Sequence, residues 1–266
     1  MNSVSDDPLQ RIAELPGVDE AVQETRSVVD RLLGHRILRR RSTDVSLESA
    51  LRGARASAAL EGAEAPLEHV RSGESDDPRV TGALRVSGEL GTLVDTWSKA
   101  PHQVLARLHT LAAADSVPTG ALGRPRTREQ TSEDVLGVGP APGAEQVPAR
   151  LRALNTLLNT PGTVPALVVS AVVHGELATL RPFGWGDGLV ARAAERLTLV
   201  ERGLDPKSLV PPEVGHAESA EEYARALHDY TTGTPEGMAA WVTHCCRAVA
   251  AGARDSLATC EALKRG

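Results

Sequence analysis

The chain of 266 residues can bury a sizeable core, as one domain or as one domain with a helical extension. Its formal net charge of -6 at pH 7 gives no support to a nucleic-acid-binding surface, and no apolar run is long enough to cross a membrane. The first residues, MNSVSDDPLQ, lack the basic and then apolar segment of a secretory signal, so we expect a soluble, cytoplasmic protein.

Aromatic residues make up only 2% of the sequence, so the core must be built from Ala, Leu and Val. Alanine-rich stripes at helical spacing favour close-packed helices over sheets, which predicts an all-α fold. The three cysteines, Cys245, Cys246 and Cys260, have no spacing typical of a zinc site or a disulfide framework. We expect them to be small buried residues.

Two helices are predicted in the N-terminal part. The first covers residues 18–41, where the pattern is amphipathic and the basic end, RILRRR, suits a helix C-terminus. The second covers residues 46–61, with Gly62 as its stop. Its apolar stripe consists of Leu47, Leu51, Ala54 and Ala58.

Glu61 lies at the end of that stripe, where an acidic side chain is unfavourable. The helix dipole repels it, and burial would remove its water. Either a cation lies opposite Glu61, or the side chain reaches solvent in a frayed last turn. Periodicity alone leaves both alternatives open.

The middle of the chain alternates loops and helices. Residues 71–79 read as a loop, and helices are predicted over residues 84–97, 104–113 and 147–158. His109, on the second of these helices, is expected to be a core or rim residue hydrogen-bonded to the backbone, and it is assigned no chemistry. Residues 119–146 are the least regular part, in which Arg124, Arg126 and Arg128 could contact a phosphate or, as exposed loop arginines more often do, bind nothing specific.

The strongest motif is a glycine-rich turn between two apolar helices. Pro182 ends the first helix, and Gly203 is placed to end the second. Gly184, Gly186 and Gly188 lie between the helices, so that backbone N–H groups can converge at a helix start, a geometry that suits a phosphate.

Two helices are predicted after this motif. Ser219 and Glu222 form a capping-box pattern that opens a short helix. Thr234 and Pro235 mark the start of a long final helix.

The turn carries a resemblance to a known family. Residues 181–192, RPFGWGDGLVAR, resemble the signature of the Fic/Doc (Fido) family, HPFx(D/E)GNGRxxR, without a gap. The identical positions are Pro182, Phe183, Gly186, Gly188 and Arg192. The resemblance implies an all-α, Fic-like helical bundle with a short β-hairpin flap. Members of the family mostly transfer AMP from ATP to a hydroxyl side chain of a target protein.

The resemblance also implies a division of the chain. Residues 1–45 would be an N-terminal helical extension, residues 46–250 the Fic-like domain and residues 251–266 the end of the C-terminal helix. The domain would contain an inhibitory helix at 46–62, a flap at about 119–146, in which residues 135–138 could form one strand, and the signature at 181–192. In the family the flap pairs with the extended backbone of the target.

A second motif concerns regulation. Residues 57–62, SAALEG, resemble the family's inhibitory motif (S/T)xxxE(G/N), so Ser57, Glu61 and Gly62 are the expected regulatory residues. In the family the glutamate pairs with the last arginine of the signature, here Arg192, and prevents ATP from placing its γ-phosphate productively. The resemblance thereby favours a cation opposite Glu61.

The positions that differ from the signature are those that carry the family's catalytic and metal-binding groups. Arg181 lies at the family's catalytic histidine, Trp185 at its metal-binding acid, Asp187 at its asparagine and Leu189 at its first arginine. A guanidinium keeps its proton and cannot act as a base, so no residue is assigned as catalytic. Tryptophan cannot bind Mg²⁺, and Asp187 could replace it only if the turn is rearranged.

An anion site remains, for ATP or another nucleotide. Its residues are Arg181, Gly186, Asp187, Gly188 and Arg192, although Asp187 adds a negative charge. Alternatively, the turn only packs two helices together and Arg181 pairs with a carboxylate such as Glu176. His174, two turns before Arg181, is expected to be a packing residue and not a replacement base.

Three functions follow from these observations. The first is a Fic-fold pseudoenzyme, impaired or inactive in protein AMPylation, that binds a nucleotide or a protein. The second is an active nucleotidyltransferase, with AMP or another phosphate-containing donor, autoinhibited by Glu61. The third is a non-catalytic protein-interaction module. All three involve an unidentified protein target or partner and neither nucleic acid nor membrane, and whether the chain is an enzyme stays open.

Overall fold

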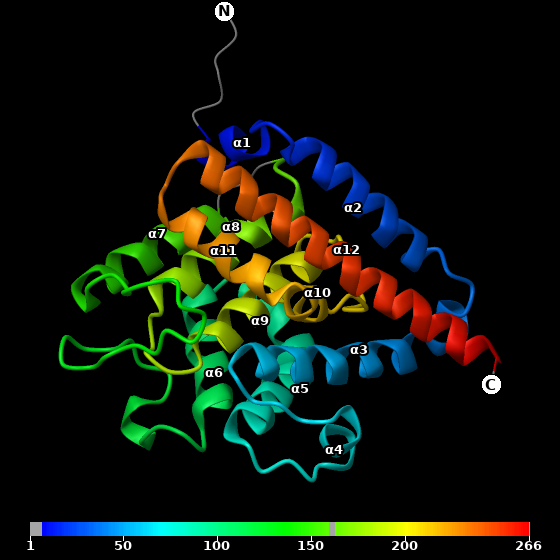
Figure 1. Cartoon of the computed structure of the whole chain (residues 1–266), viewed down its shortest axis with the longest axis horizontal. Coiled ribbons are helices and arrows are strands. Elements are labelled where there is room, and N and C mark those ends of the chain that lie inside the picture. The colour runs from blue at the N-terminus through cyan, green and yellow to red at the C-terminus, as the bar shows by residue number, and fades with distance from the viewer. Residues whose placement is uncertain (1–6, 160–162, 266) are drawn as a thin grey trace, which may run out of the picture.

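The computed structural model describes residues 7–159 and 163–265 and is built from helices joined by loops (Figure 1). The helices in chain order are α1 (Pro8–Ala13), α2 (Val18–Leu33), α3 (Leu38–Leu60), α4 (Leu67–Ser72), α5 (Pro78–Trp97), α6 (Pro101–Ala113), η1 (Thr119–Ala121), η2 (Ala144–Gln146), α7 (Val147–Asn159), α8 (Ala166–Leu180), α9 (Asp187–Glu201), α10 (Pro212–Glu218), α11 (Ala220–Thr231) and α12 (Pro235–Arg265).

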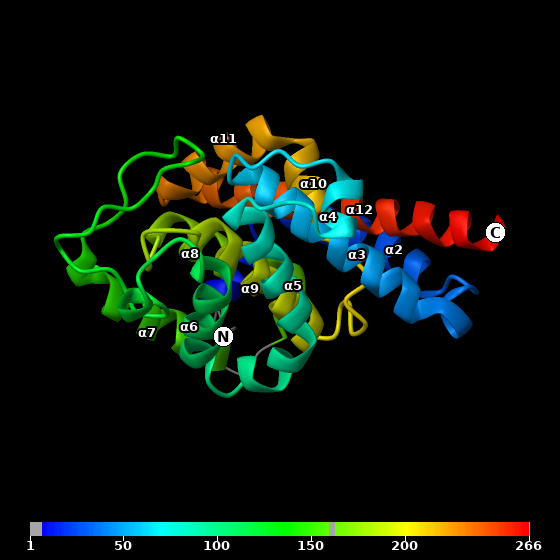
Figure 2. The ribbon, with the colours of Figure 1, turned by 90° about the horizontal axis from the view of Figure 1, so that it is seen from below.

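The centre of the molecule is the pair α8 and α9, which flank the glycine-rich turn. Both helices are buried on nearly every side, as expected for α8, which is apolar all round, whereas α9 also buries the charged side chains of Arg192, Glu195 and Arg196. The long helix α12 packs along α2, α10 and α11, while α3 packs against α5 and α10 (Figures 1 and 2). The end of α3 and the start of α9 are therefore brought together at the middle of the bundle.

The N-terminal helices differ from the prediction. The predicted helix over residues 18–41 is divided, because α2 ends at Leu33 and α3 begins at Leu38. The basic segment therefore opens α3, and the chain turns between two leucines, Leu32 and Leu38, that are both buried. Leu47 is 65% exposed, so the inward face of α3 was predicted wrongly there.

The C-terminal helices lie where the sequence predicts them, but the capping box does not form. Ser219 is the N-cap residue of α11 without a side-chain cap, because its hydroxyl donates to the carbonyl oxygen of Gly215 instead. Thr234 and Pro235 do precede and open α12.

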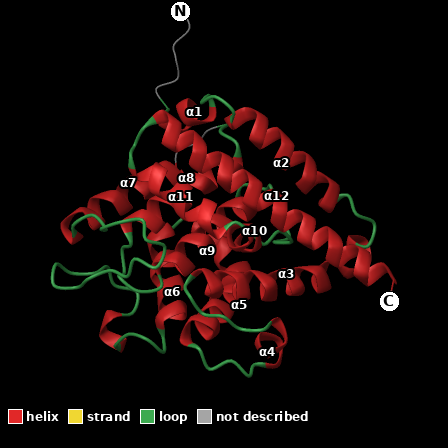
Figure 3. Ribbon diagram, viewed as in Figure 1, coloured by secondary structure: helices red, strands yellow, loops and turns green. Residues whose placement is uncertain are grey.

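The all-α fold is confirmed, and the expected flap has no strands. Within residues 7–159 and 163–265 no strand occurs, and the segment 119–146 is a long loop with two short 3-10 turns (Figure 3). Its backbone pairs with the signature turn: the N–H of Arg126 donates to the carbonyl of Pro182, and the N–H of Glu133 to that of Gly184. Gly137, with φ +66°, also breaks the extended geometry that residues 135–138 would need.

The division into an extension, a Fic-like domain and a C-terminal end stays a prediction. Its boundaries at residues 45 and 250 both lie inside helices, α3 and α12. Among the helices of the described residues, none combines the length and the apolar character needed to cross a membrane.

Candidate anion site at the signature turn

The end of α3 has the geometry that sets Glu61 in place. Gly62 has φ +87°, the left-handed conformation that commonly ends helices. The N–H of Ala63 donates to the carbonyl of Ala58 at 3.0 Å, and that of Gly62 to the carbonyl of Ala59 at 2.9 Å. This Schellman motif ends the helix at Gly62, as predicted. Glu61 is the C-cap residue of α3 and is 6% exposed.

Arg192 lies opposite Glu61, as the motif comparison led us to expect. Its Nη2 donates to Glu61 Oε1 at 2.7 Å and to the carbonyl of Ser57 at 3.0 Å. Its Nε donates to the hydroxyl of Ser57 at 2.8 Å, and Nη1 lies 3.4 Å from the hydroxyl of Tyr223. Of the two alternatives for Glu61, the solvent-exposed one is therefore wrong.

This ion pair is buried. The side chain of Arg192 is 0% exposed and that of Glu61 is 5% exposed. Burial lowers the pKa of Arg192, but the Glu61 carboxylate and the Tyr223 hydroxyl together outweigh it, so the pKa lies above its usual value. Arg192 is thus a buried cation whose charge is balanced by Glu61, the C-cap residue of α3.

Gly188 makes room for the Glu61 carboxylate at the first turn of α9. A Cβ atom added at Gly188 would lie 2.0 Å from Glu61 Oε1 and 2.9 Å from Arg192 Nη1. A helix N-terminus favours negative charge because its first N–H groups have no partner within the helix. The carboxylate of Glu61 thus takes the position at which the glycine-rich turn was predicted to hold a phosphate.

The turn itself is closed by Asp187. The carboxylate of Asp187 accepts the N–H of Phe183 at 2.9 Å and that of Gly184 at 2.7 Å. Gly184 and Gly186 have φ of +89° and +65°, which glycine adopts without strain. Burial raises the pKa of Asp187 to about 7, although the two N–H groups oppose the shift.

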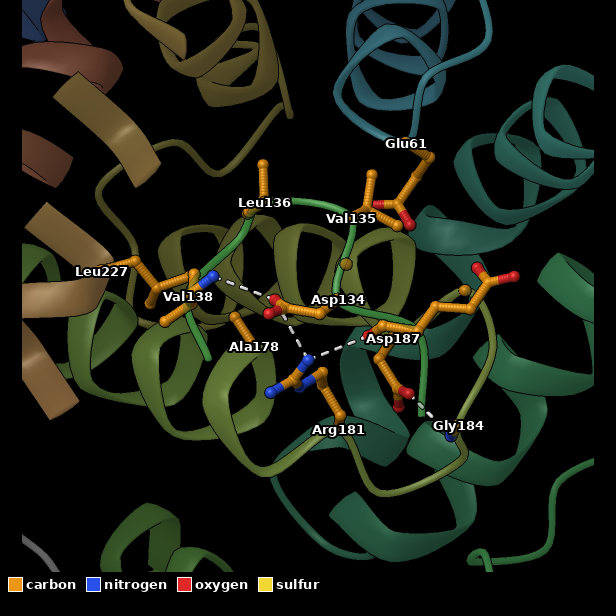
Figure 4. A pocket seen from close by; sticks show the side chains of 13 residues that line it. Glu61, Asp134, Val135, Leu136, Val138, Ala178, Arg181, Gly184, Asp187 and Leu227 are labelled. Atoms are coloured by element: carbon orange, nitrogen blue, oxygen red, sulfur yellow. Dashed lines mark hydrogen bonds and ion pairs between the residues drawn. The ribbon is translucent and has the colours of Figure 1, made fainter. Parts of the chain in front are cut away.

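Arg181 does not pair with Glu176, which binds Arg150 at 2.6 Å instead. The guanidinium of Arg181 donates to the carbonyl of Glu133 at 3.0 Å and to that of Gly139, and it lies 3.1 Å from the carboxylate of Asp134 (Figure 4). Arg181 is thus bound by the long loop rather than free at the rim of an anion site.

Asp134 organises that part of the loop. Its two carboxylate oxygens accept the N–H of Val138 at 2.9 Å and that of Gly139 at 2.8 Å. The resulting turn, residues 133–139, lies over the signature turn and is called the cover loop here. Arg181 and Asp134 together fix the cover loop to the end of α8.

The space beneath the cover loop is small. It is lined by acidic residues, by glycines of the turn and by apolar side chains of the cover loop, α8 and α11 (Figure 4): Glu61, Glu133, Asp134, Val135, Leu136, Val138, Ala178, Arg181, Gly184, Gly186, Asp187, Gly188 and Leu227. Its volume is about 30 Å³, close to the share of one water molecule and far below a pocket for a nucleotide. The site is therefore closed in this conformation.

The residues at the turn do not fit a magnesium ion. Trp185 lies under the guanidinium of Arg79, 5.7 Å from the ring centroid, and offers no oxygen ligand. Both oxygens of Asp187 already accept backbone N–H groups. Leu189 is buried and adds no cation. Among the residues that the structure describes at this turn, the features suited to an anion are the start of α9 and Arg192.

Two further predictions concern the neighbouring helix and loop. His109 is buried, accepts the N–H of Gly123 at 2.9 Å and stacks on Phe183 with ring centroids 4.3 Å apart, which confirms it as a backbone-bonded core residue. Burial lowers its pKa to about 4.

Arg126 is buried and binds the carbonyls of Arg181, Leu180 and Pro142, so it holds the loop to the end of α8 instead of contacting a phosphate.

The structure brings together most of the predicted site residues. Ser57, Glu61, Gly188 and Arg192 form one contact group, and Gly186 and Asp187 shape the turn beside it. Sequence reasoning missed Asp134, Arg126 as a loop anchor, and Tyr223 as a partner of Arg192. The hydroxyl of Tyr223 contacts both Arg192 and His174. No local spacing links these residues to the signature.

The described chain resembles solved structures of Fic proteins. A Fic family protein from Desulfovibrio desulfuricans G20 superposes with a TM-score of 0.72 at 21% identity, over 90% of this chain and 74% of that one. A Fic-1 fragment from C. elegans gives 0.71 at 20% identity, over 92% and 73%. A Fic domain containing signaling protein from Bacteroides thetaiotaomicron VPI-5482 gives 0.69 at 15% identity, over 91% and 98%. No protein-family model matches the sequence, and no curated protein matches it. The architecture of this chain is the Fic fold.

Proposed function

We propose that this chain is a Fic-fold protein, impaired in AMP transfer, whose signature turn binds a phosphate group of a nucleotide when Glu61 leaves it. The observation that carries the proposal is the position of the Glu61 carboxylate, 2.7 Å from Arg192 and against Gly188. The carboxylate is an anion held at a helix N-terminus and by an arginine, the two features that also suit a phosphate group.

Impaired transfer follows from the residue at the family's base position. Arg181 cannot accept a proton from a hydroxyl group, and its guanidinium is held by Asp134 and the carbonyl of Glu133. A missing general base typically costs about 10²- to 10⁴-fold in rate. Since Trp185 also supplies no oxygen for a metal, the usual means of stabilising a leaving pyrophosphate is weakened as well.

Phosphate binding is supported by the groups around the Glu61 carboxylate. Arg192 offers several N–H donors in a planar fork, which suits a phosphate as well as a carboxylate. The start of α9 adds the positive end of the helix dipole. Because the space is only about 30 Å³, a nucleotide requires that Glu61 and the cover loop both move.

Calorimetric titration with ATP, ADP and AMP, each with and without Mg²⁺, tests the proposal on three proteins. The Glu61→Gly variant should bind at least about tenfold more tightly than the wild type, because the competing carboxylate is gone. The double variant Glu61→Gly, Arg192→Met should lose that gain. If neither the wild type nor Glu61→Gly binds any of these nucleotides, an interaction module without a ligand is the better function.

Labelling with ATP that carries a radioactive α-phosphate tests the second part. Neither the wild type nor Glu61→Gly should transfer label to itself or to proteins of a lysate. Stable label on Glu61→Gly that disappears in Glu61→Gly, Arg192→Met would instead indicate an active, autoinhibited nucleotidyltransferase.

A further inference from the structure

A second polar cluster lies in the core, away from the pocket at the signature turn. It consists of His174 on α8, Glu195 on α9, His216 on α10 and Cys245 on α12. One ligand atom of each residue lies within 4.8 Å of the ligand atoms of the other three, and all four residues are buried. Four helices thus direct nitrogen, oxygen and sulfur donors at one point.

The carboxylate of Glu195 is at the centre of this cluster. Its Oε2 lies 2.8 Å from His174 Nδ1 and 3.0 Å from His216 Nε2. The other oxygen, Glu195 Oε1, is buried and has no hydrogen-bond partner. Nearly all buried polar atoms in native proteins have a partner, so this atom points to a ligand at this position.

The far nitrogens of both imidazoles are held by other side chains. His174 Nε2 lies 2.8 Å from the hydroxyl of Tyr223, and His216 Nδ1 lies 3.0 Å from His244 Nε2. Such outer partners fix the tautomer and orientation of metal-binding histidines. Here they leave Nδ1 of His174 and Nε2 of His216 as the nitrogens that face Glu195.

The charges of the donors indicate which kind of ion they suit. Two neutral imidazoles, one carboxylate and one thiolate carry a net charge of about -2, which a divalent cation balances. Nitrogen and sulfur donors in a set of four suit zinc, whereas magnesium and calcium prefer oxygen ligands. A closed set of four protein ligands is typical of a structural zinc site and leaves no position for a substrate.

We propose that His174, Glu195, His216 and Cys245 bind one Zn²⁺ ion that fastens the four central helices together. Binding requires the Cys245 thiol to lose its proton, which leaves with solvent as the thiolate–zinc bond forms. With Nδ1 of His174 on the ion, its Nε2 carries the proton and donates to Tyr223, the residue whose hydroxyl also contacts Arg192. The site therefore lies two contacts from the Glu61–Arg192 pair.

Cys246 provides a matched control for Cys245. Both thiols are buried neighbours on α12, and only Cys245 belongs to the cluster. The full chain, purified without an affinity tag that binds metal, should contain about one zinc per chain by mass spectrometry. Cys245→Ala and His216→Gln should each retain at least about tenfold less zinc after dialysis, while Cys246→Ala retains it all.

Two further measurements keep the test decisive if a variant folds poorly. Wild-type protein reconstituted with Co²⁺ should show the visible bands of a tetrahedral site with a thiolate ligand, and Cys246→Ala should show them too. A strong chelator should lower the melting temperature of the wild type. A folded wild type that takes up no zinc or cobalt, or an equal loss of metal in Cys245→Ala and Cys246→Ala, would overturn the proposal and leave a hydrogen-bonded cluster without an ion.

Discussion

Arg192 and Glu61 are 131 residues apart in sequence, and they form a buried ion pair at the contact between α9 and the end of α3. Ser57, one turn before Glu61, binds the same guanidinium through its hydroxyl and its carbonyl. The charge of Arg192 is thus balanced by one short segment, so displacement of that segment would expose an uncompensated cation to any anion that enters.

Removal of the Glu61 carboxylate should destabilise the protein in an anion-dependent way. Removing one partner of a buried ion pair typically lowers the free energy of unfolding by about 3–5 kcal/mol, because the other charge stays buried without its partner. We therefore expect Glu61→Gly to lower the free energy of unfolding by about that amount in chloride buffer, measured by urea denaturation. Inorganic phosphate should restore part of the loss in the variant and change the wild type little.

Glu64→Gly is the matched control, since Glu64 is exposed three residues further on. It should change the free energy of unfolding by less than about 0.5 kcal/mol and show no response to phosphate. An equal response of Glu61→Gly and Glu64→Gly to phosphate would mean that the anion acts on the whole protein and not at Arg192.

Gly188→Ala tests whether Glu61 occupies the first turn of α9. The added Cβ would lie 2.0 Å from Glu61 Oε1, so the substitution should destabilise the protein by about 1–3 kcal/mol. In the Glu61→Gly background the same change should cost less, because the Glu61 carboxylate is gone and only Arg192 Nη1, the far end of a flexible side chain, remains at 2.9 Å. The coupling energy from this double-mutant cycle should exceed about 0.5 kcal/mol.

Gly91→Ala shows what the same substitution does without a neighbour. Gly91 lies in α5, is exposed and would gain a Cβ with nothing within 4 Å. It should stabilise the helix by up to about 1 kcal/mol. Additive effects of Gly188→Ala and Glu61→Gly would contradict the contact between these two residues.

How much of this site could be predicted varies from residue to residue. The Glu61–Arg192 pair could be predicted because each partner belongs to a short motif of fixed spacing, and the helices around it follow from apolar periodicity. The cover loop could not, because its conformation depends on Arg126 and Arg181 binding carbonyls that are distant in sequence. The same is true of the core cluster, whose four residues come from four helices with no common spacing.

Arg181 should act as a clamp on the cover loop. Arg181→Ala removes the contacts to Asp134 and to the carbonyls of Glu133 and Gly139, so the loop should open more often. We expect the amide protons of Val138 and Gly139 to exchange at least about tenfold faster, as measured by hydrogen exchange with mass spectrometry or NMR.

Arg128→Ala is the control for this clamp. Arg128 lies in the long loop 119–146, outside the cover loop, and its side chain is 79% exposed. It should leave the exchange of those amides unchanged. Equal protection in the wild type and Arg181→Ala would show that Asp134 holds the cover loop without Arg181.

Asp187 should make the stability of the protein fall as pH rises through the weakly acidic range. Burial raises its pKa from 3.8 to about 7, so between these values the unfolded chain loses the proton that the folded protein keeps. The free energy of unfolding then decreases with pH, by at most about 1.4 kcal/mol per pH unit for one proton, and levels off above about pH 7.

Asp187→Asn removes this titration while one backbone N–H of the turn loses its acceptor, a cost that does not depend on pH. In urea denaturation from about pH 5 to about pH 8, the wild type should lose stability relative to the variant as the pH rises to about 7, with little further change above that pH. Asp95→Asn, at an exposed position of α5, should run parallel to the wild type. A pH-independent difference between the wild type and Asp187→Asn would show that Asp187 is already ionised across this range, with the N–H groups of Phe183 and Gly184 stabilising its charge.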